Sequence, residues 1–140
     1  MIRVYIAGKY SDDSVLSVLG NIRKGMKAAK ELLLRGFAPY CPWLDHQLVF
    51  QMTNEEADSL TVDLFYDYSI AWLEASDCMY LLREGIINSK GVAKEIEFAV
   101  AHHIPIFTSM EDLDAWASNA DIRASGVIRK TEAALGLAAQ

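Results

Sequence analysis

Short apolar runs alternate along the chain with longer segments whose apolar residues recur every three or four positions. Four short runs are typical of β-strands: residues 2–7, 37–41, 77–82 and 104–107. Five longer segments have helical spacing: residues 15–34, a stretch through 71–73, and residues 92–103, 110–117 and 122–138. Strands that alternate with helices predict parallel strand pairs joined by right-handed helical crossovers.

This order of elements is typical of an α/β fold. We expect a Rossmann-like, flavodoxin-like doubly wound parallel sheet of four to five strands, with helices on both faces. The length of 140 residues suits a single domain over residues 1–140. Such sheets bind ligands beyond the carboxyl ends of their strands, where the strand order reverses. In a flavodoxin-like order the first and third strands are neighbours, so the segments GKYS (8–11) and INSKG (87–91) are expected to meet.

Charge and cysteine content exclude some partners. The formal net charge of -6 argues against broad binding to a nucleic-acid polymer, because such binding requires clusters of cations. Cys41 and Cys78 form no C-x-x-C pair and are expected to be buried thiols in a reducing compartment. The opening MIRVYIAG is too short for a signal peptide, and no apolar run approaches the roughly 20 residues that span a bilayer. We therefore expect a cytoplasmic protein without a membrane partner.

Candidate chemistry is concentrated in SKGVAKEIEFAV, residues 89–100. On a helix the apolar stripe consists of four residues: Val92, Ile96, Ala99 and Val100. Glu95 falls on the edge of this stripe, whereas Lys94 and Glu97 point away from it. A carboxylate there is partly desolvated, which makes Glu95 a candidate nucleophile. The same spacing also fits an ordinary surface glutamate, which is the commoner case.

Ser89 and Gly91 stand where this helix begins. Ser89 can cap the helix, and Gly91 permits close backbone approach, so together with free N–H groups they can hold a small anion. Ordinary capping uses the same residues and is the simpler interpretation of this pair alone.

Three segments resemble the nucleoside 2-deoxyribosyltransferase superfamily: VYIAGKYS (4–11), WLEASD (72–77) and SKGVAKEIEFAVAHHIPI (89–106). The S-x-G-x-x-x-E pattern of the last segment is the strongest element. Within this superfamily the chain most resembles the branch of nucleoside 5'-monophosphate N-glycosidases. The members of that branch are similar to 2'-deoxynucleoside 5'-phosphate N-hydrolases. The resemblance implies that Glu95 attacks the anomeric carbon of the sugar and that the hydroxyl of Tyr5 lies near Glu95. A carboxylate can trap an oxocarbenium-like centre covalently, after which water completes a hydrolase and a second base completes a transferase.

The position six residues before the glutamate bears on the substrate. The resemblance pairs aspartate there with the transferases and serine with the branch that acts on 5'-monophosphates; this chain has Ser89. A hydroxyl can donate to a phosphate that an aspartate would repel. Lys9, Arg23 and Lys90 are near enough in the predicted fold to assist, although each taken singly also fits solvated surface charge.

One position departs from the family pattern. Relatives carry an aspartate, thought to protonate the leaving base, where this chain has Ser69, which we expect to contact the substrate instead. A local shift brings Asp67 or Asp63 into the site, or Asp77 or Asp45 substitutes. Alternatively the acid is missing, which implies slow turnover, another leaving group, or a fold kept for binding.

Further residues extend the predicted site. Gly8 suits close approach of the first loop to a sugar or phosphate. His46 in PWLDHQ can line a base pocket together with Trp43 and Tyr40, because aromatic rings stack on nucleobases. Packing in the core or a loop explains the aromatic residues equally well.

No cofactor and no metal is expected. The adjacent His102 and His103 lack metal-ligand spacing, and the chain has no G-x-G-x-x-G, G-x-x-x-x-G-K-[ST] or G-x-S-x-G motif. The expected partner is a small nucleotide or nucleoside. The resemblance also implies a homodimer whose partner subunit closes the site, through the Trp116 helix or a surface of Phe65, Tyr66 and Tyr68.

Three functions therefore remain open. The first is a hydrolase that cleaves the N-glycosidic bond of a (deoxy)nucleoside 5'-monophosphate. The second is a base-exchanging deoxyribosyltransferase, against which Ser89 argues. The third is a non-catalytic nucleotide-binding module, which Ser69 favours.

Overall fold

A computed structural model of the chain describes residues 1–83 and 89–119, apart from the side chain of His46. The sheet has four strands: β1 (Arg3–Ala7), β2 (Ala38–Tyr40), β3 (Cys78–Leu81) and β4 (Ile106–Phe107). All pair in parallel, in the order β2-β1-β3-β4. The predicted α/β doubly wound fold is confirmed, including the contact between the first and third strands. The helix predicted over residues 122–138 lies outside the described residues.

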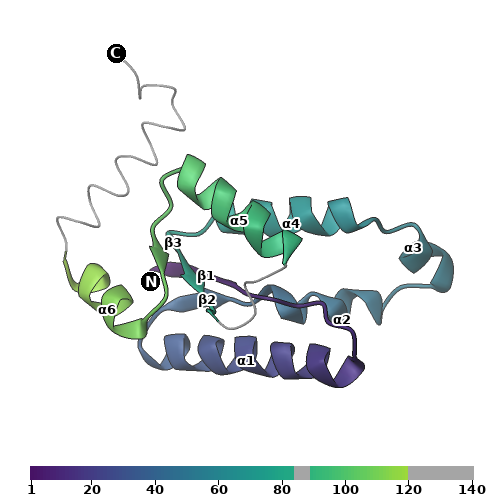
Figure 1. Cartoon of the computed structure of the whole chain (residues 1–140), viewed down its shortest axis with the longest axis horizontal. Coiled ribbons are helices and arrows are strands. Elements are labelled where there is room, and N and C mark those ends of the chain that lie inside the picture. Colours follow the sequence, from purple (N-terminus) through teal and green to yellow (C-terminus); the bar gives the residue numbers. More distant parts are fainter. Residues whose placement is uncertain (84–88, 120–140) are drawn as a thin grey trace, which may run out of the picture.

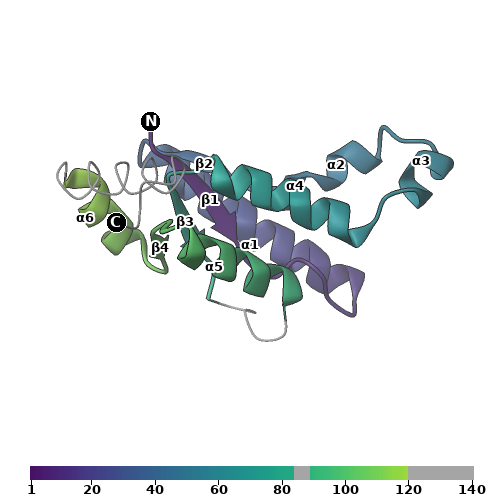
Figure 2. The ribbon, with the colours of Figure 1, turned by 90° about the horizontal axis from the view of Figure 1, so that it is seen from above.

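Helices cover both faces of this sheet. The four longer ones are α1 (Val15–Leu34), α4 (Val62–Glu74), α5 (Lys90–Ala101) and α6 (Met110–Ser118). Figure 1 shows α1 on one side of the strands and α4 with α5 on the other, and Figure 2 shows the same layers from above. Among the helices of residues 1–83 and 89–119, none is both long and apolar enough to cross a membrane.

Alternation along β1 builds the two layers. Val4 and Ile6 pack with α1 and α6, whereas Tyr5 and Ala7 pack with α4 and α5. All four side chains are fully buried, as the period of two along a strand requires when both faces of the sheet are covered. A tyrosine in this buried row must place its hydroxyl where a polar partner is available. The strand therefore directs the Tyr5 side chain into the space between the sheet and the two helices α4 and α5.

Helix boundaries follow local capping rules. The hydroxyl of Ser14 accepts a hydrogen bond from the backbone N–H of Ser17 at 3.0 Å and begins α1. Gly36 follows the helix with a φ of 87°, a conformation that favours glycine. Ser109 caps α6 in the same way, by accepting from the backbone N–H of Asp112 at 3.1 Å.

The segment between β2 and α4 has more structure than its sequence pattern predicts. It contains η1 (Pro42–Leu44), α2 (His46–Val49) and α3 (Asn54–Asp58). The helix α3 has a capping box, in which Thr53 and Glu56 each bond the other's backbone N–H. Helices of three to five residues are too short to show an apolar period, so a period search misses them. Their importance is that η1 and α2 form one wall of the candidate site.

Candidate active site

The carboxyl ends of β1 and β3 lie side by side. Ala7 pairs with Leu81 in the parallel register, and the N–H of Leu82 donates to the carbonyl of Ala7 at 2.8 Å. A cavity of about 540 Å³ opens beyond these ends. Its lining comes from both predicted segments: Gly8, Lys9, Tyr10 and Ser11 from the first, and Ser89, Lys90 and Gly91 from the second. The cavity lies at the edge of the sheet where such folds bind ligands.

Glu95 reaches the cavity from the second turn of α5. The hydroxyl of Tyr5, a residue with 0% exposure, donates a hydrogen bond to Oε1 of Glu95 at 2.7 Å. Glu97 is exposed, so the predicted separation of the two glutamates is confirmed. The predicted apolar stripe is wrong at one position, because Val100 is 63% exposed while Val92 and Ala99 are buried. The helix turns the last part of that stripe toward solvent.

Burial changes the acidity of this pair. Burial raises the pKa of Glu95 to about 7, and the hydrogen bond from Tyr5 acts in the opposite direction. The pKa of Tyr5 is raised far above its usual range, first by burial and then by the negative charge of Glu95. The phenol therefore keeps its proton, while Glu95 changes protonation state near neutral pH. A buried carboxylate poised in this range is typical of functional sites.

Ser69 completes a short polar chain with this pair. It lies on α4, lines the cavity and interacts through its hydroxyl with Tyr5, which lowers the pKa of Tyr5 against the larger effect of burial. Asp67 is exposed and does not line the cavity, so its predicted place in the site is wrong. Two residues along a helix correspond to a rotation of roughly 200° about its axis, which turns Asp67 away when Ser69 faces inward. Asp63 is also exposed and outside the lining.

Asp45 is the aspartate that the chain brings to the cavity. It lies between η1 and α2, and the hydroxyl of Tyr40 lies 2.9 Å from each of its carboxylate oxygens. Tyr40 is the register partner of Tyr5, and the two rings stack with centroids 5.9 Å apart. Asp77, the other predicted substitute, instead pairs with Arg3 at the amino end of the sheet.

Cations and a helix start line another side of the cavity. Lys9 lines it and forms an ion pair with Asp12 at 2.8 Å, and Lys90 joins it from the first turn of α5. Ser89 caps α5 by accepting from the N–H of Val92 at 3.4 Å, so one residue both caps the helix and lines the cavity. Gly91 lines the cavity too, and a Cβ there would lie 3.2 Å from the ring of Tyr66.

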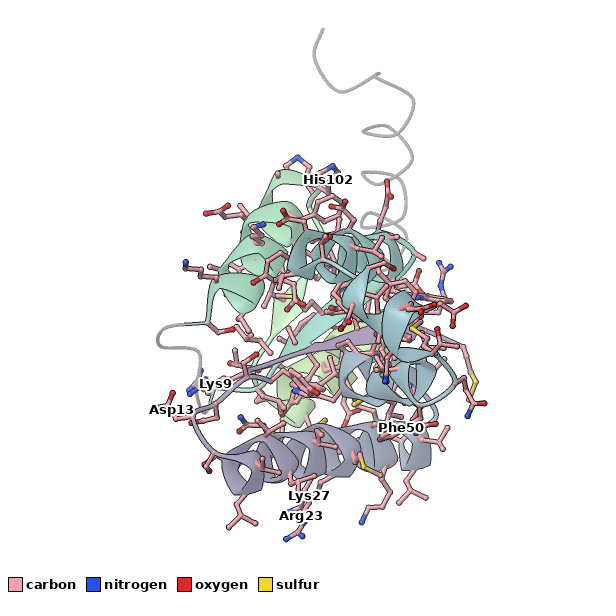
Figure 3. All side chains as sticks on the ribbon, turned by 90° about the vertical axis from the view of Figure 1, so that its right-hand side faces the viewer. Lys9, Asp13, Arg23, Lys27, Phe50 and His102 are labelled. Carbon is pink, nitrogen blue, oxygen red and sulfur yellow. The ribbon has the colours of Figure 1, made fainter. Side chains whose placement is uncertain are left out.

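Arg23 does not belong to this group. It lies on α1, is exposed, and does not line the cavity. Figure 3 shows Arg23 and Lys27 pointing away from the sheet on the outer side of α1, while Lys9 lies on another side of the molecule. The predicted contact of Arg23 with the substrate is wrong, because the helix places its basic stripe opposite the face that packs on the sheet.

Residues 2–109 match the family described as "Domain of unknown function (DUF7768)". The chain belongs to this family. The comparison with curated proteins finds no match. All residues that line the cavity fall within the matched part of this DUF7768 chain, whereas α6 lies beyond it.

Trp43 has a structural role in the DUF7768 chain. Its ring is buried, and a Cβ added at Gly8 or Gly25 would lie 2.9 Å or 2.5 Å from it. Its indole N–H donates to the carbonyl of Lys9 at 3.1 Å, which holds the first loop at the cavity rim. Gly8 therefore permits close approach of Trp43 as well as lining the cavity. His46 begins α2, but its side chain lies outside the described part of the chain.

An apolar wall of the cavity was missed from the sequence. It consists of four side chains: Val49, Val62, Phe65 and Tyr66. Val49 belongs to the unpredicted α2, and the others lie on the first turns of α4. In the described ranges no group of three or more His, Cys, Asp or Glu side chains is placed to hold a metal ion. Cys41 and Cys78 are buried, as predicted, and form no disulfide bond with each other.

Proposed function

We propose that this DUF7768 protein hydrolyses the N-glycosidic bond of a nucleoside 5'-monophosphate, with Glu95 as the attacking carboxylate. The observation that carries the proposal is the Tyr5–Glu95 hydrogen bond of 2.7 Å at the base of a cavity of about 540 Å³. A buried carboxylate held by a neutral donor is oriented without being neutralised by a cation. Such a group is suited to attack an electron-poor carbon.

The lining of the cavity matches the three parts of a nucleotide. Lys9, Lys90 and the capped start of α5 provide positive charge and N–H donors for the 5'-phosphate. Phe65 offers ring surface for the base. The sugar then lies between these two ends, against Glu95. Figure 3 is in keeping with such a separation, because Lys9 and Phe50, the residue that ends α2, lie on different sides of the molecule.

The reaction has two steps. The Glu95 carboxylate first bonds to the anomeric carbon while the bond from that carbon to the base breaks, and the base departs with the bonding electrons and takes a proton from solvent. Water then attacks the same carbon, returns a proton to solvent and releases Glu95 with the sugar 5-phosphate. The sum adds the hydrogen of one water to the base and its hydroxyl to the sugar. This is the two-step logic of retaining glycosidases.

Turnover is expected to be slow. General-acid assistance is worth about two to four powers of ten in rate, and this chain has Ser69 where the nucleoside 2-deoxyribosyltransferases that it resembles carry an aspartate for this role. The same residue supports the second candidate, a nucleotide-binding module without turnover. A base-exchanging transferase is the third candidate and requires a second base to enter the cavity.

A homodimer in the cytoplasm is part of the proposal. Exposed apolar side chains lie on α2 and α4, two of the helices that line the cavity, and Phe50, directly after α2, is 76% exposed. A second copy that covers them also shields the site from water. Trp116 supports the alternative surface less well, because it packs on Phe107 with centroids 5.3 Å apart. Buried thiols at Cys41 and Cys78 are compatible with a reducing compartment.

Base release tests the proposal. Ribo- and deoxyribonucleoside 5'-monophosphates are incubated with the wild type, Glu95→Gln and the matched control Glu97→Gln, and free base is measured by chromatography. We expect release by the wild type and Glu97→Gln but not by Glu95→Gln. Monophosphate binding without release by any of the three supports the binding module. Release that requires an added acceptor base, with a new nucleotide as product, supports the transferase.

A further inference from the structure

Two tyrosine–carboxylate pairs stand next to each other in this site. Tyr5 and Tyr40 are register partners on adjacent strands, and their stacked rings carry hydroxyls that bind Glu95 and Asp45 respectively. Both carboxylates line the same cavity. The proposed reaction uses Glu95 and leaves Asp45 without a role.

Asp45 is arranged as a hydrogen-bond acceptor. The hydroxyl of Tyr40 lies 2.9 Å from each oxygen of the Asp45 carboxylate and donates a hydrogen bond to it. Tyr40 is itself fixed by stacking on Tyr5 and on Trp72, with centroids 5.9 Å and 4.8 Å away. The acceptor is therefore held in a defined orientation.

The surroundings of Asp45 limit what it can bind. It belongs to the wall made by η1 and α2, with Pro42 and Val49 beside it in the cavity lining. A phosphate is excluded there, since like charges repel, and Lys9 and Lys90 offer it a better place. A group that Asp45 binds in this wall is uncharged or cationic and carries N–H or O–H donors.

We infer that Asp45 is a specificity-determining residue that selects substrates whose base carries an exocyclic amino group. The inference rests on the proposed function, because it takes the cavity to hold a nucleoside 5'-monophosphate with its base against the η1–α2 wall. An amino group presents an N–H donor to this carboxylate, and a base without the amino group cannot form that hydrogen bond. Hydrogen bonds to charged groups contribute about 1.5–3 kcal/mol, which corresponds to roughly a tenfold to hundredfold difference in affinity.

Binding measurements on matched ligands test this inference without requiring turnover. Calorimetry compares adenosine with purine riboside 5'-monophosphate, and cytidine with the pyrimidin-2-one riboside 5'-monophosphate. In each pair the second ligand lacks only the amino group. We expect the wild type to bind the amino member of at least one pair at least about tenfold more tightly. The Asp45→Asn variant should lose this preference, while Asp58→Asn, at an exposed position on α3, should keep it.

A second variant guards against misfolding of Asp45→Asn. Tyr40→Phe leaves the carboxylate in place but removes its orienting donor, and we expect the amino preference to fall severalfold. The melting temperature of each variant reports whether it is folded.

Three results would overturn the inference. The first is equal binding of the two ligands of each pair by the wild type, and the second is a preference for the amino ligand that survives in Asp45→Asn. The third is a preference that disappears when ribose is replaced by deoxyribose, which would assign Asp45 to a sugar hydroxyl. Failure of the proposed function has a different signature: no base is released, while binding and its dependence on Asp45 remain.

Discussion

The two ends of β1 carry two polar pairs that differ in what burial does to them. At the amino end, Arg3 forms an ion pair with Asp77 at 2.7 Å, and the side chains are 59% and 24% exposed. Two residues further toward the carboxyl end, the hydroxyl of Tyr5 donates to Glu95 at the same distance of 2.7 Å, and the Tyr5 side chain is fully buried. The first pair joins opposite charges in contact with water, and the second holds a carboxylate against a neutral phenol.

This difference in burial affects the pKa values of the groups in the two pairs. The hydrogen bond and charge of Asp77 raise the pKa of Arg3, so the guanidinium stays ionised. Burial raises the pKa of Glu95 to about 7 because the neutral partner only partly offsets it. An exposed ion pair contributes little and does no chemistry, whereas an uncompensated buried carboxylate destabilises the fold and is retained where it has a function.

The largest difference between the two ends is expected in base release. Glu95→Gln removes the attacking oxygen while keeping the shape of the side chain, so kcat/KM should fall by at least about a thousandfold. Asp77→Asn breaks a pair of similar geometry far from the cavity and should change kcat/KM by less than about threefold. Steady-state rates of base release measure both. Equal effects of the two substitutions would remove the functional distinction between the ends.

The next largest effect is on stability and depends on pH. The pKa of Glu95 is higher in the folded protein, at about 7, than in the unfolded chain, at about 4.5. The contribution of this group to stability is therefore fully present below pH 4.5 and is lost as the pH rises through about 7. The difference corresponds to roughly 3 kcal/mol at high pH. Glu95→Gln should therefore unfold less readily than the wild type at pH 9 and show little advantage at pH 5.

Denaturant unfolding at the two pH values measures this effect. Glu97→Gln, at an exposed position on the same helix, should follow the wild type at both values. A stability difference for Glu95→Gln that is independent of pH would contradict a raised pKa at this position.

A smaller effect is expected when the hydroxyl of Tyr5, the donor in the pair with Glu95, is removed. The hydrogen bond from Tyr5 lowers the pKa of Glu95, so Tyr5→Phe should move the acid limb of the rate profile to higher pH. Activity at pH 7 should fall by about tenfold and partly recover at pH 9. Tyr80→Phe, on the opposite face of the sheet, serves as the control for loss of a tyrosine hydroxyl. An unchanged acid limb in Tyr5→Phe would show that this bond does not set the acidity of Glu95.

The smallest effect distinguishes two neighbouring positions on α4. Ser69 interacts with Tyr5 in the cavity, so Ser69→Ala should lower kcat/KM by severalfold. Asp67 is exposed outside the cavity, and Asp67→Asn should leave kcat/KM within about twofold of the wild type. A larger loss in Asp67→Asn than in Ser69→Ala would mean that α4 presents a different face to the substrate.

Periodicity was sufficient to predict the sheet and the edge at which the cavity opens. The helical spacing of α5 separates Glu95 from Glu97 before any coordinates are known. The same geometry argues against Asp67, and the structure agrees with the regular helix rather than with a local shift. Arg23 was misplaced because proximity along a predicted fold does not tell which side of α1 a residue occupies.

The remaining part of the site depends on long-range contacts that no local pattern encodes. Asp45 and Val49 enter the cavity because η1 and α2 fold against the carboxyl end of the sheet. Trp43 sets this position by packing against two glycines that are distant in sequence. Short helices lack a detectable period, so the wall they form could be found only from the three-dimensional arrangement.

Mass spectrometry of the protein after brief exposure to a reactive monophosphate tests the role of Glu95 most directly. The account predicts a sugar-phosphate adduct on the wild type that accompanies release of the base and maps to the peptide containing Glu95. Glu95→Gln should carry no adduct, and Glu97→Gln should carry it at Glu95. Base release without any adduct under single-turnover conditions, or an adduct on another residue, would contradict attack by Glu95.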